Sequence, residues 1–185
     1  ADIRNILALR GDKCAERPPA NHFAYASDLI RHIKEFGDFS VSGACYPENH
    51  PETPDRETSL RHLKEKTDAG TEHLISQLFF GNHDFYTFLK DVRAAGIEVP
   101  VSAGIMPVTG KGQIERMAAL CCAFLPPEVV AMMHRYEFDK DSLMNAGAEY
   151  AAAQIKELIA RGADGIHLYT MNNPAVVKKI YKEIR

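Results

Sequence analysis

Several signals that define specialised protein classes are missing from this chain of 185 residues. No uninterrupted apolar run approaches the roughly 20 residues that a membrane-spanning helix needs, so we expect no membrane partner. The formal net charge of −3 gives no reason to expect a nucleic-acid partner. Neither GxGxxG nor the GxxxxGK phosphate-loop motif follows an apolar segment, which argues against a nucleotide-binding open sheet.

Patterns typical of disulfide frameworks and metal sites are also missing. The four cysteines show no CxxC spacing, and the adjacent Cys121 and Cys122 suit a disulfide framework poorly. We therefore expect reduced thiols in a cytoplasmic protein. The histidines are numerous but lack HxH or HExxH spacing, so no metal site is expected.

What the sequence does contain is an alternation of short apolar segments with helical patterns, which we interpret as one domain over residues 1–185. The apolar segments predict strands at 5–9, 39–46, 73–80, 99–106 and 165–169. The helical patterns predict helices around 29–36, 60–69, 85–92, 114–121, 142–161 and 174–184, and a further short helix that begins at Pro126-Pro127. Three segments, "DAGTEHLISQ", "AAGIEVPVSA" and "ARGADGIHLY", each end a helix at a glycine and then enter a strand. This repetition favours βα units and a parallel sheet.

Two architectures fit such units: a (β/α)₈ barrel and a doubly wound open sheet. The nearly continuous apolar strands predict a sheet covered on both faces. All five predicted strands end in polar, glycine-bearing or proline-bearing segments, as expected where a barrel builds its site. We therefore expect an α/β fold of the (β/α)₈ TIM barrel type. A complete barrel needs eight units in about 250 residues, so this chain would supply about five of them, the C-terminal five-eighths.

The strand ends supply the candidate site residues. Arg10-Gly11-Asp12 combines a fork of donors with a carboxylate, although a loop with a local ion pair would look the same. Tyr46 and His50 lie in the stiff "YPENHPE" loop, either as ligand contacts or as a packed ring and a surface histidine.

Three further polar side chains have two interpretations each. Gln77 interrupts the apolar "LISQLFF" segment, so its amide either bonds within the core or faces a ligand. Gln113 follows the glycine-rich "TGKG", which reads as a mobile loop over a site or as a surface loop. Lys66 either reaches a phosphate or is a solvated helix lysine.

Seven motifs in order resemble the methylenetetrahydrofolate reductase family: "ALRGD", "YASDLI", "YPENHPE", "LKEKTDAG", "ISQLFF", "AGIMPV" and "HLYTMN". The resemblance runs across nearly the whole chain. It implies a barrel flavoprotein that carries FAD at the carboxyl ends of the strands and takes hydride from NADH or NADPH. It also implies the conversion of methylenetetrahydrofolate to methyltetrahydrofolate, within one-carbon metabolism and methionine biosynthesis.

The resemblance also assigns roles by motif. It implies FAD contacts at Arg10, Gly11, Asp12, Tyr25, Ala26, Tyr46, His50 and Lys66. It implies folate contacts at Asp12, Gln77 and Gln113. A carboxylate at Asp12, beside the pyrimidine edge of a flavin, would oppose the negative charge that builds on the reduced ring. It would also favour the cationic iminium form of the folate. Asp12 is therefore the expected catalytic residue.

The chain departs from the family pattern in several places. The family's general acid is a glutamate on the first barrel strand, which has no counterpart here, so we expect the 185-residue chain alone to lack this proton donor. Family-typical residues are also replaced at Ser59, His62, Glu65, Met117 and Asn173. A homo-oligomer or a second subunit would complete the enzyme. The alternatives are a flavin-free pterin-binding methyltransferase barrel and a non-catalytic binding module.

Overall fold

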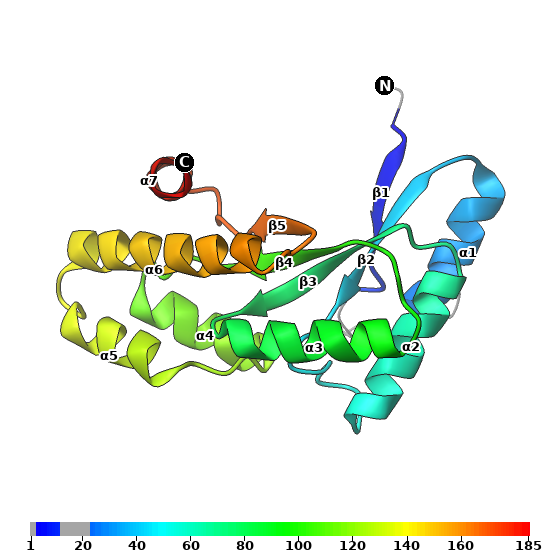
Figure 1. The fold of residues 1–185 in the computed structure, drawn as a ribbon, viewed down its shortest axis with the longest axis horizontal. Helices are drawn as coiled ribbons and strands as arrows, with labels where there is room; N and C mark the ends of the chain where they lie inside the picture. The colour runs from blue at the N-terminus through cyan, green and yellow to red at the C-terminus, as the bar shows by residue number, and fades with distance from the viewer. Residues whose placement is uncertain (1–2, 12–22) are drawn as a thin grey trace, which may run out of the picture.

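The computed structural model describes residues 3–11 and 23–185. Its single sheet has five parallel strands in the order β1-β2-β3-β4-β5, each beside its neighbour in sequence (Figure 1). The strands are β1 (Asn5–Ala8), β2 (Ser40–Cys45), β3 (His73–Phe79), β4 (Val101–Ile105) and β5 (Gly165–Leu168). Because a doubly wound sheet reverses its strand order at a switch point, this unbroken order is that of consecutive barrel units. The expected barrel-type fold with five units is confirmed, and the sheet formed by this chain is open.

Helices connect every pair of strands. They are α1 (Ala26–Phe36), α2 (Arg56–Asp68), α3 (Asn82–Ala94), α4 (Lys111–Cys121), α5 (Pro127–Arg135), α6 (Lys140–Ala160) and α7 (Pro174–Ile184). The helix starts have local causes: the side chains of Asp55, Asp139 and Asn173 accept hydrogen bonds from the first-turn amides of α2, α6 and α7.

The three repeated glycines end helices as predicted. Gly70, Gly96 and Gly162 have φ values of 113°, 71° and 78°, which place them in the left-handed region after α2, α3 and α6. Each turn feeds the next strand within a few residues. The repeated sequence pattern therefore marks three equivalent αβ connections.

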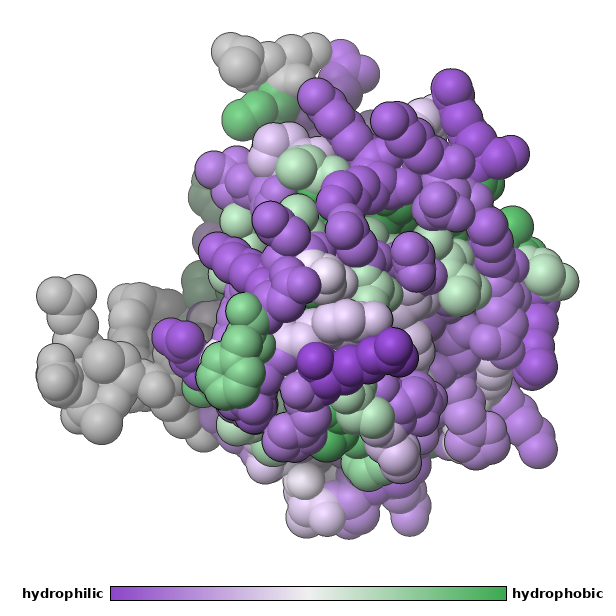
Figure 2. All heavy atoms as spheres, turned by 90° about the vertical axis from the view of Figure 1, so that its left-hand side faces the viewer, coloured by the Kyte–Doolittle hydropathy of each residue, from purple (hydrophilic) through white to green (hydrophobic). Residues whose placement is uncertain are grey.

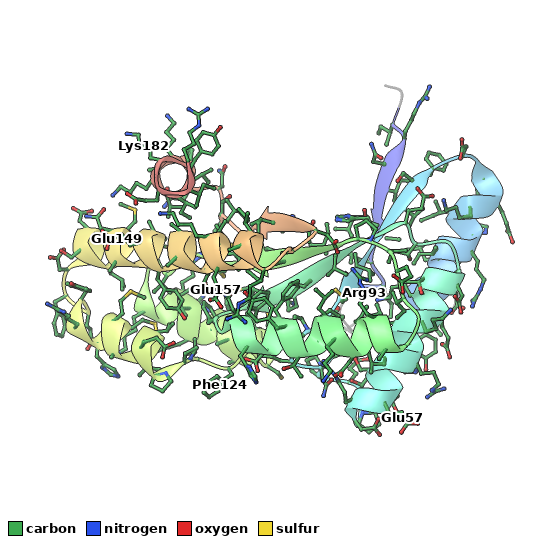
Figure 3. All side chains as sticks on the ribbon, viewed as in Figure 1. Glu57, Arg93, Phe124, Glu149, Glu157 and Lys182 are labelled. Carbon is green, nitrogen blue, oxygen red and sulfur yellow. The ribbon has the colours of Figure 1, made fainter. Side chains whose placement is uncertain are left out.

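The main core lies between the sheet and helices α3, α6 and α7. Its centre holds Phe79 and Phe85, whose rings stack at 5.1 Å, with Ile105 and Ile155 also fully buried. At the amino-terminal edge of the strands, Arg93 donates to the carbonyls of Ile97 and Val99 and pairs with Asp164 at 2.8 Å (Figure 3). In barrels this edge serves stability rather than catalysis.

The strands are less uniformly apolar than the sequence suggested. Burial alternates along β2 and β3, so every second residue is only half-buried. On these positions the His73 ring joins two neighbouring strands, through Nδ1 to the Ser42 hydroxyl (3.2 Å) and Nε2 to the Ser102 hydroxyl (2.9 Å). The expectation that both faces are apolar and covered was therefore wrong at the strand centres.

The surface of the end formed by α5 and the start of α6 is mostly hydrophilic, with isolated apolar side chains (Figure 2). Within the described residues, no helix combines the length and apolarity needed to cross a bilayer.

Candidate active site

The parallel strand order places the carboxyl ends of all five strands at one edge of the sheet. Arg10 and Gly11 follow β1, Tyr46 follows β2, and Gln77 lies near the end of β3. Most of the residues chosen from the sequence therefore share one edge. Asp12, the expected catalytic residue, lies outside the described residues.

Arg10 connects the first two strand ends. Its NH1 and NH2 donate to the two oxygens of Glu52 at 2.8 and 3.0 Å, and its Nε donates to the Gly11 carbonyl at 3.1 Å. Gly11 has a φ of 83°, a conformation that glycine adopts without strain. The Arg10 ion pair is therefore not local, because its partner lies in the loop after β2.

The "YPENHPE" loop holds Tyr46 and His50 against each other. Their rings meet edge to face, with centroids 4.6 Å apart and planes at 81°. The backbone amide of Glu52 donates to His50 Nδ1 at 3.0 Å. Because Nδ1 accepts here, the proton of a neutral His50 sits on Nε2, which makes that nitrogen the donor.

Two anchors that the sequence did not reveal fix this loop. Glu48 Oε2 accepts a hydrogen bond from the backbone amide of Phe124 at 2.5 Å. Arg56, at the start of α2, donates to the Pro47 carbonyl at 2.7 Å and to Asp91 on α3 at 3.1 Å. The loop is therefore stiffened by long-range polar contacts as well as by its prolines.

The start of α1 lies beside α2. Tyr25 precedes the first residue of the helix, Ala26, and its backbone amide donates to Asp28 at 3.0 Å. The Tyr25 ring is half-exposed and lies 5.4 Å from the ring of His62 on α2. The two helices thus present an aromatic pair to solvent.

Lys66 points into the layer between α2 and β2. Its Nζ donates to the Ala44 carbonyl at 2.5 Å, and its stem passes over Gly43, where a Cβ would lie 2.9 Å from the lysine Cδ. Burial lowers the pKa of Lys66 and raises the pKa of the neighbouring Cys45 thiol to about 12. A phosphate contact by Lys66 would need the side chain to turn from this position.

Gln77 lies where β3 departs from regular pairing. The register between β3 and β4 shifts between Ile75 and Leu78, and Gln77 Oε1 accepts a hydrogen bond from the Leu78 amide at 2.9 Å. The Ser76 hydroxyl donates to the Gln77 carbonyl and accepts from the Gly104 amide at 2.8 Å. β3 continues past this irregularity and ends at Phe79, two residues after Gln77.

Gln113 lies in the first turn of α4. Its Oε1 accepts a hydrogen bond from the Thr109 hydroxyl at 3.3 Å. The segment leading to it packs on α6, because the Val108 carbonyl meets the backbone of Gly147 so closely that a Cβ there would lie 1.8 Å from the oxygen. Lys111 also pairs with Glu137 at 2.7 Å, so the start of α4 is held by two neighbours.

Tyr169 directly follows β5 and is a further residue of the candidate site. The sequence predicted it only as the last residue of a strand. Its hydroxyl donates to the Ser76 carbonyl at 2.9 Å, across β4, over the bare backbone of Gly104. Burial raises the pKa of Tyr169 to about 12, with smaller contributions from Cys45, Cys121 and Tyr46. The ends of β2, β3 and β5 therefore meet around this ring.

Residues 3–11 and 23–185 contain no group of three or more His, Cys, Asp or Glu side chains arranged to hold a metal ion. The chemistry at this edge comes instead from a guanidinium, an imidazole, two phenols and two amides. Such a set binds and orients an anionic or heteroaromatic ligand.

A family model described as methylenetetrahydrofolate reductase matches residues 1–185. The chain belongs to the methylenetetrahydrofolate reductase family. The resemblance drawn from the sequence motifs is thereby confirmed. The edge described above is the carboxyl-terminal edge at which barrel enzymes place their sites.

Curated relatives of this family match most of the chain. A probable methylenetetrahydrofolate reductase (NADPH) from Caenorhabditis elegans is 37% identical over 190 residues, covering 98% of this chain and 28% of that protein. Methylenetetrahydrofolate reductase (NADH) 1 from Arabidopsis thaliana is 35% identical, covering 92% and 31%. The 5,10-methylenetetrahydrofolate reductase from Escherichia coli is 36% identical, covering 92% and 57%. The chain thus spans from under a third to somewhat over half of these relatives.

A solved structure supports the fold. It is an uncharacterised protein from Clostridium thermocellum, described as binding two copies of 5-methyl-5,6,7,8-tetrahydrofolic acid. It superposes with a TM-score of 0.63 over 97% of this chain and 70% of its own, at 14% sequence identity. At that identity the likeness shows the architecture of this methylenetetrahydrofolate reductase family member and not its ligand.

Proposed function

We propose that the protein to which this chain belongs reduces methylenetetrahydrofolate to methyltetrahydrofolate with a bound flavin and NADH or NADPH. The observation that carries the proposal is the meeting of Arg10, Tyr46 and Gln77 at one sheet edge, in a chain of this family. The hydride donor is given as NADH or NADPH because the relatives include one protein named for NADPH and one named for NADH.

The described residues fit FAD as the flavin. Arg10 is a cation at the end of β1, and Nε2 of His50 is a donor in the tautomer set by the Glu52 amide. Lys66 would add a second cation once its side chain turns away from the Ala44 carbonyl. These groups suit a diphosphate and its sugar, while Tyr46 and the half-exposed Tyr25 supply aromatic surface. A Cβ on Gly11 would meet nothing within 4 Å, and Ala26, the first residue of α1, has a small side chain, so both are proposed to allow close approach of the cofactor. When bound, the flavin would supply hydride transfer.

The remaining roles belong to the folate. Gln77 and Gln113 carry amides on β3 and α4, which can pair with the donor and acceptor edge of a pterin. Asp12 is proposed to favour the cationic iminium form of the folate by its negative charge. The proton donor for ring opening is proposed to lie in a longer chain, on the glutamate that these 185 residues lack.

The proposal includes a cytoplasmic location, for which the free thiols of Cys45 and Cys122 are suited. It also includes a homo-oligomer or a second subunit as a partner in the enzyme.

The test is a visible spectrum of the full-length protein followed by two half-reactions. We expect a flavin band near about 450 nm that NAD(P)H bleaches and methylenetetrahydrofolate restores. In Asp12→Asn, the folate half-reaction should slow much more than the NAD(P)H half-reaction. A protein with no flavin band that transfers a methyl group from a pterin would instead support the methyltransferase alternative. Equal slowing of both half-reactions would contradict the proposal that Asp12 promotes reduction of the folate.

A further inference from the structure

A cleft lies beside the start of α3, just after the carboxyl end of β3. It has a volume of about 630 Å³ and is bordered by the start of α3, the segment 124–128 and α6. Figure 3 shows Glu157 on α6 and Phe124 on opposite sides of the start of α3. The residues that matter most for its chemistry are Asp84, Tyr86, Glu128, Gln154, Glu157 and Arg161.

Buried oxygens without hydrogen-bond partners gather around this cleft. Gln154 is only 6% exposed, and its Nε2 donates to the Phe80 carbonyl at 2.9 Å, but its Oε1 has no partner. Glu48 Oε1 is likewise buried without a partner, and the Tyr86 hydroxyl has none at hydrogen-bond distance, although burial and the nearby Glu157 carboxylate raise its pKa. Across residues 3–11 and 23–185 these are the only buried side-chain nitrogen or oxygen atoms in that state.

The three oxygens lie in or beside the same cleft. Gln154 and Tyr86 line the cleft, and Glu48 reaches its rim through the hydrogen bond to the Phe124 amide. Buried polar atoms are nearly always hydrogen-bonded, because leaving one unpaired costs the free energy of its lost hydration. Two such atoms in the lining of one cleft, with a third at its rim, mark a place where a ligand with hydrogen-bond donors would gain partners.

The charge of the cleft is negative. The carboxylates of Asp84, Glu128 and Glu157 line it, and Arg161 is the one guanidinium among its lining residues. Arg161 is already engaged, with its NH2 3.2 Å from Glu157 and its guanidinium 4.7 Å above the Tyr86 ring. Burial and the nearby Glu128 and Glu157 also raise the pKa of Tyr150, which lines the same cleft, to about 12.

These features select one ligand chemistry. The amide oxygen of Gln154 can only accept, so it favours a ligand with a donor, and the Tyr86 hydroxyl can accept from the same ligand. The excess of carboxylates favours positive charge. The described residues include no metal-binding group of three, so a metal ion is a poor fit. The guanidinium of Arg161 lies over the Tyr86 ring, so the aromatic side of the cleft is suited to contact with a flat cation.

We propose that this cleft binds a small organic cation that carries a guanidinium or primary ammonium group. The cation would donate to Gln154 Oε1 and the Tyr86 hydroxyl while its charge is balanced by Asp84 and Glu128. The proposal does not rest on the flavin chemistry, because Gln154, Tyr86, Asp84 and Glu128 have no assigned role in the candidate active site; only Glu48, at the rim of the cleft, also anchors the loop that holds Tyr46 and His50.

The test is isothermal titration of the full-length protein with methylguanidinium, compared with N-methylurea, which has a similar shape but no charge. We expect methylguanidinium to bind at least about tenfold more tightly than N-methylurea, and to bind more weakly as the salt concentration rises. Equal binding of the two probes, or no binding of methylguanidinium at concentrations up to about 10 mM, overturns the proposal.

Two variants locate the site. Tyr86→Phe removes a buried unpaired hydroxyl, so it should raise the melting temperature of the ligand-free protein and weaken methylguanidinium binding by about fivefold. Glu128→Gln, at an exposed position of the cleft, should weaken binding by a similar factor. Tyr181→Phe on α7 is the matched control and should leave binding unchanged. Binding that is the same in all three variants, or that Mg²⁺ abolishes at equal ionic strength, contradicts the proposal.

Discussion

The guanidinium of Arg10 and the carboxylate of Glu52 form a two-pronged ion pair, with N–O distances of 2.8 and 3.0 Å. The pair joins the end of β1 to the far end of the loop that follows β2, 42 residues later in the chain. It therefore sets the position of Arg10 relative to Tyr46 and His50, which lie in the same loop.

Replacing Glu52 should disturb ligand binding more than stability. The side chains of the pair are 23% and 38% exposed, so solvent screens it and Glu52→Gln should cost no more than about 1 kcal/mol in the free energy of unfolding. Under the proposed function, FAD affinity should fall by about threefold or more as Arg10 loses its fixed position. Urea unfolding and FAD fluorescence titration measure the two effects. Asp68→Asn, in an exposed pair with Lys64, is the control, and an equal loss of FAD affinity in both variants would argue against this role.

Gly147 should be intolerant of any side chain. A Cβ there would lie 1.8 Å from the Val108 carbonyl oxygen, and backbone atoms cannot move aside cheaply. Gly147→Ala should therefore cost about 3 kcal/mol in the free energy of unfolding. Gly112, in α4, has no heavy atom within 4 Å of its virtual Cβ, so Gly112→Ala should keep or slightly raise stability. Thermal unfolding of the two variants checks the difference, and equal melting temperatures would refute the close packing of α6 on the segment before α4.

His167 should make stability depend on pH. Burial and the neighbouring His73 lower the pKa of His167, so the unfolded chain takes up this proton more readily than the folded protein. Stability should then fall as the pH drops below the ordinary histidine value of about 6.5, and level off below the lowered folded-state pKa. His167→Asn should reduce this slope in urea unfolding between about pH 7 and 5, while His134→Asn on the exposed face of α5 should retain it. A slope identical in His167→Asn and the unaltered protein would show that another group causes it.

The variant Lys66→Met tests whether Lys66, which points inward in the structure, also binds the cofactor. Lys66→Met keeps the apolar stem over Gly43 and removes the charge and the hydrogen bond to Ala44, at a cost of about 1 kcal/mol in stability. FAD affinity should fall by about tenfold at low salt, with the difference shrinking as salt increases. Lys64→Met on the same helix should leave FAD affinity unchanged. If the two lysine variants bind FAD alike, Lys66 is a structural contact between α2 and β2 only.

Local sequence patterns predicted the elements of this fold well. The alternation of apolar segments and helical periods predicted each strand and helix found in residues 3–11 and 23–185. Gly70, Gly96 and Gly162 marked the ends of three helices because left-handed turns favour glycine. The carboxyl edge of a parallel sheet then gathered the strand-end residues, since strands that run the same way end on the same side.

Contacts between distant segments could not be predicted in this way. Glu48 bonds the amide of Phe124, 76 residues away, and no local pattern pairs a loop carboxylate with one particular backbone amide. The direction of Lys66 depends on the space above Gly43, which is a property of two packed elements. The polar contacts that join Ser42, His73 and Ser102 could not be predicted, because they depend on the register of three paired strands.

The central claim is that the strand ends form one flavin site, and His50 tests it most directly. Its Nδ1 is fixed by the Glu52 amide, so His50→Ala removes a positioned donor with little disturbance of the core. The account predicts that the FAD dissociation constant of the full-length protein rises at least about tenfold in His50→Ala and stays within about twofold in His134→Ala on α5. An unchanged dissociation constant in His50→Ala, or the same rise in both variants, would contradict it.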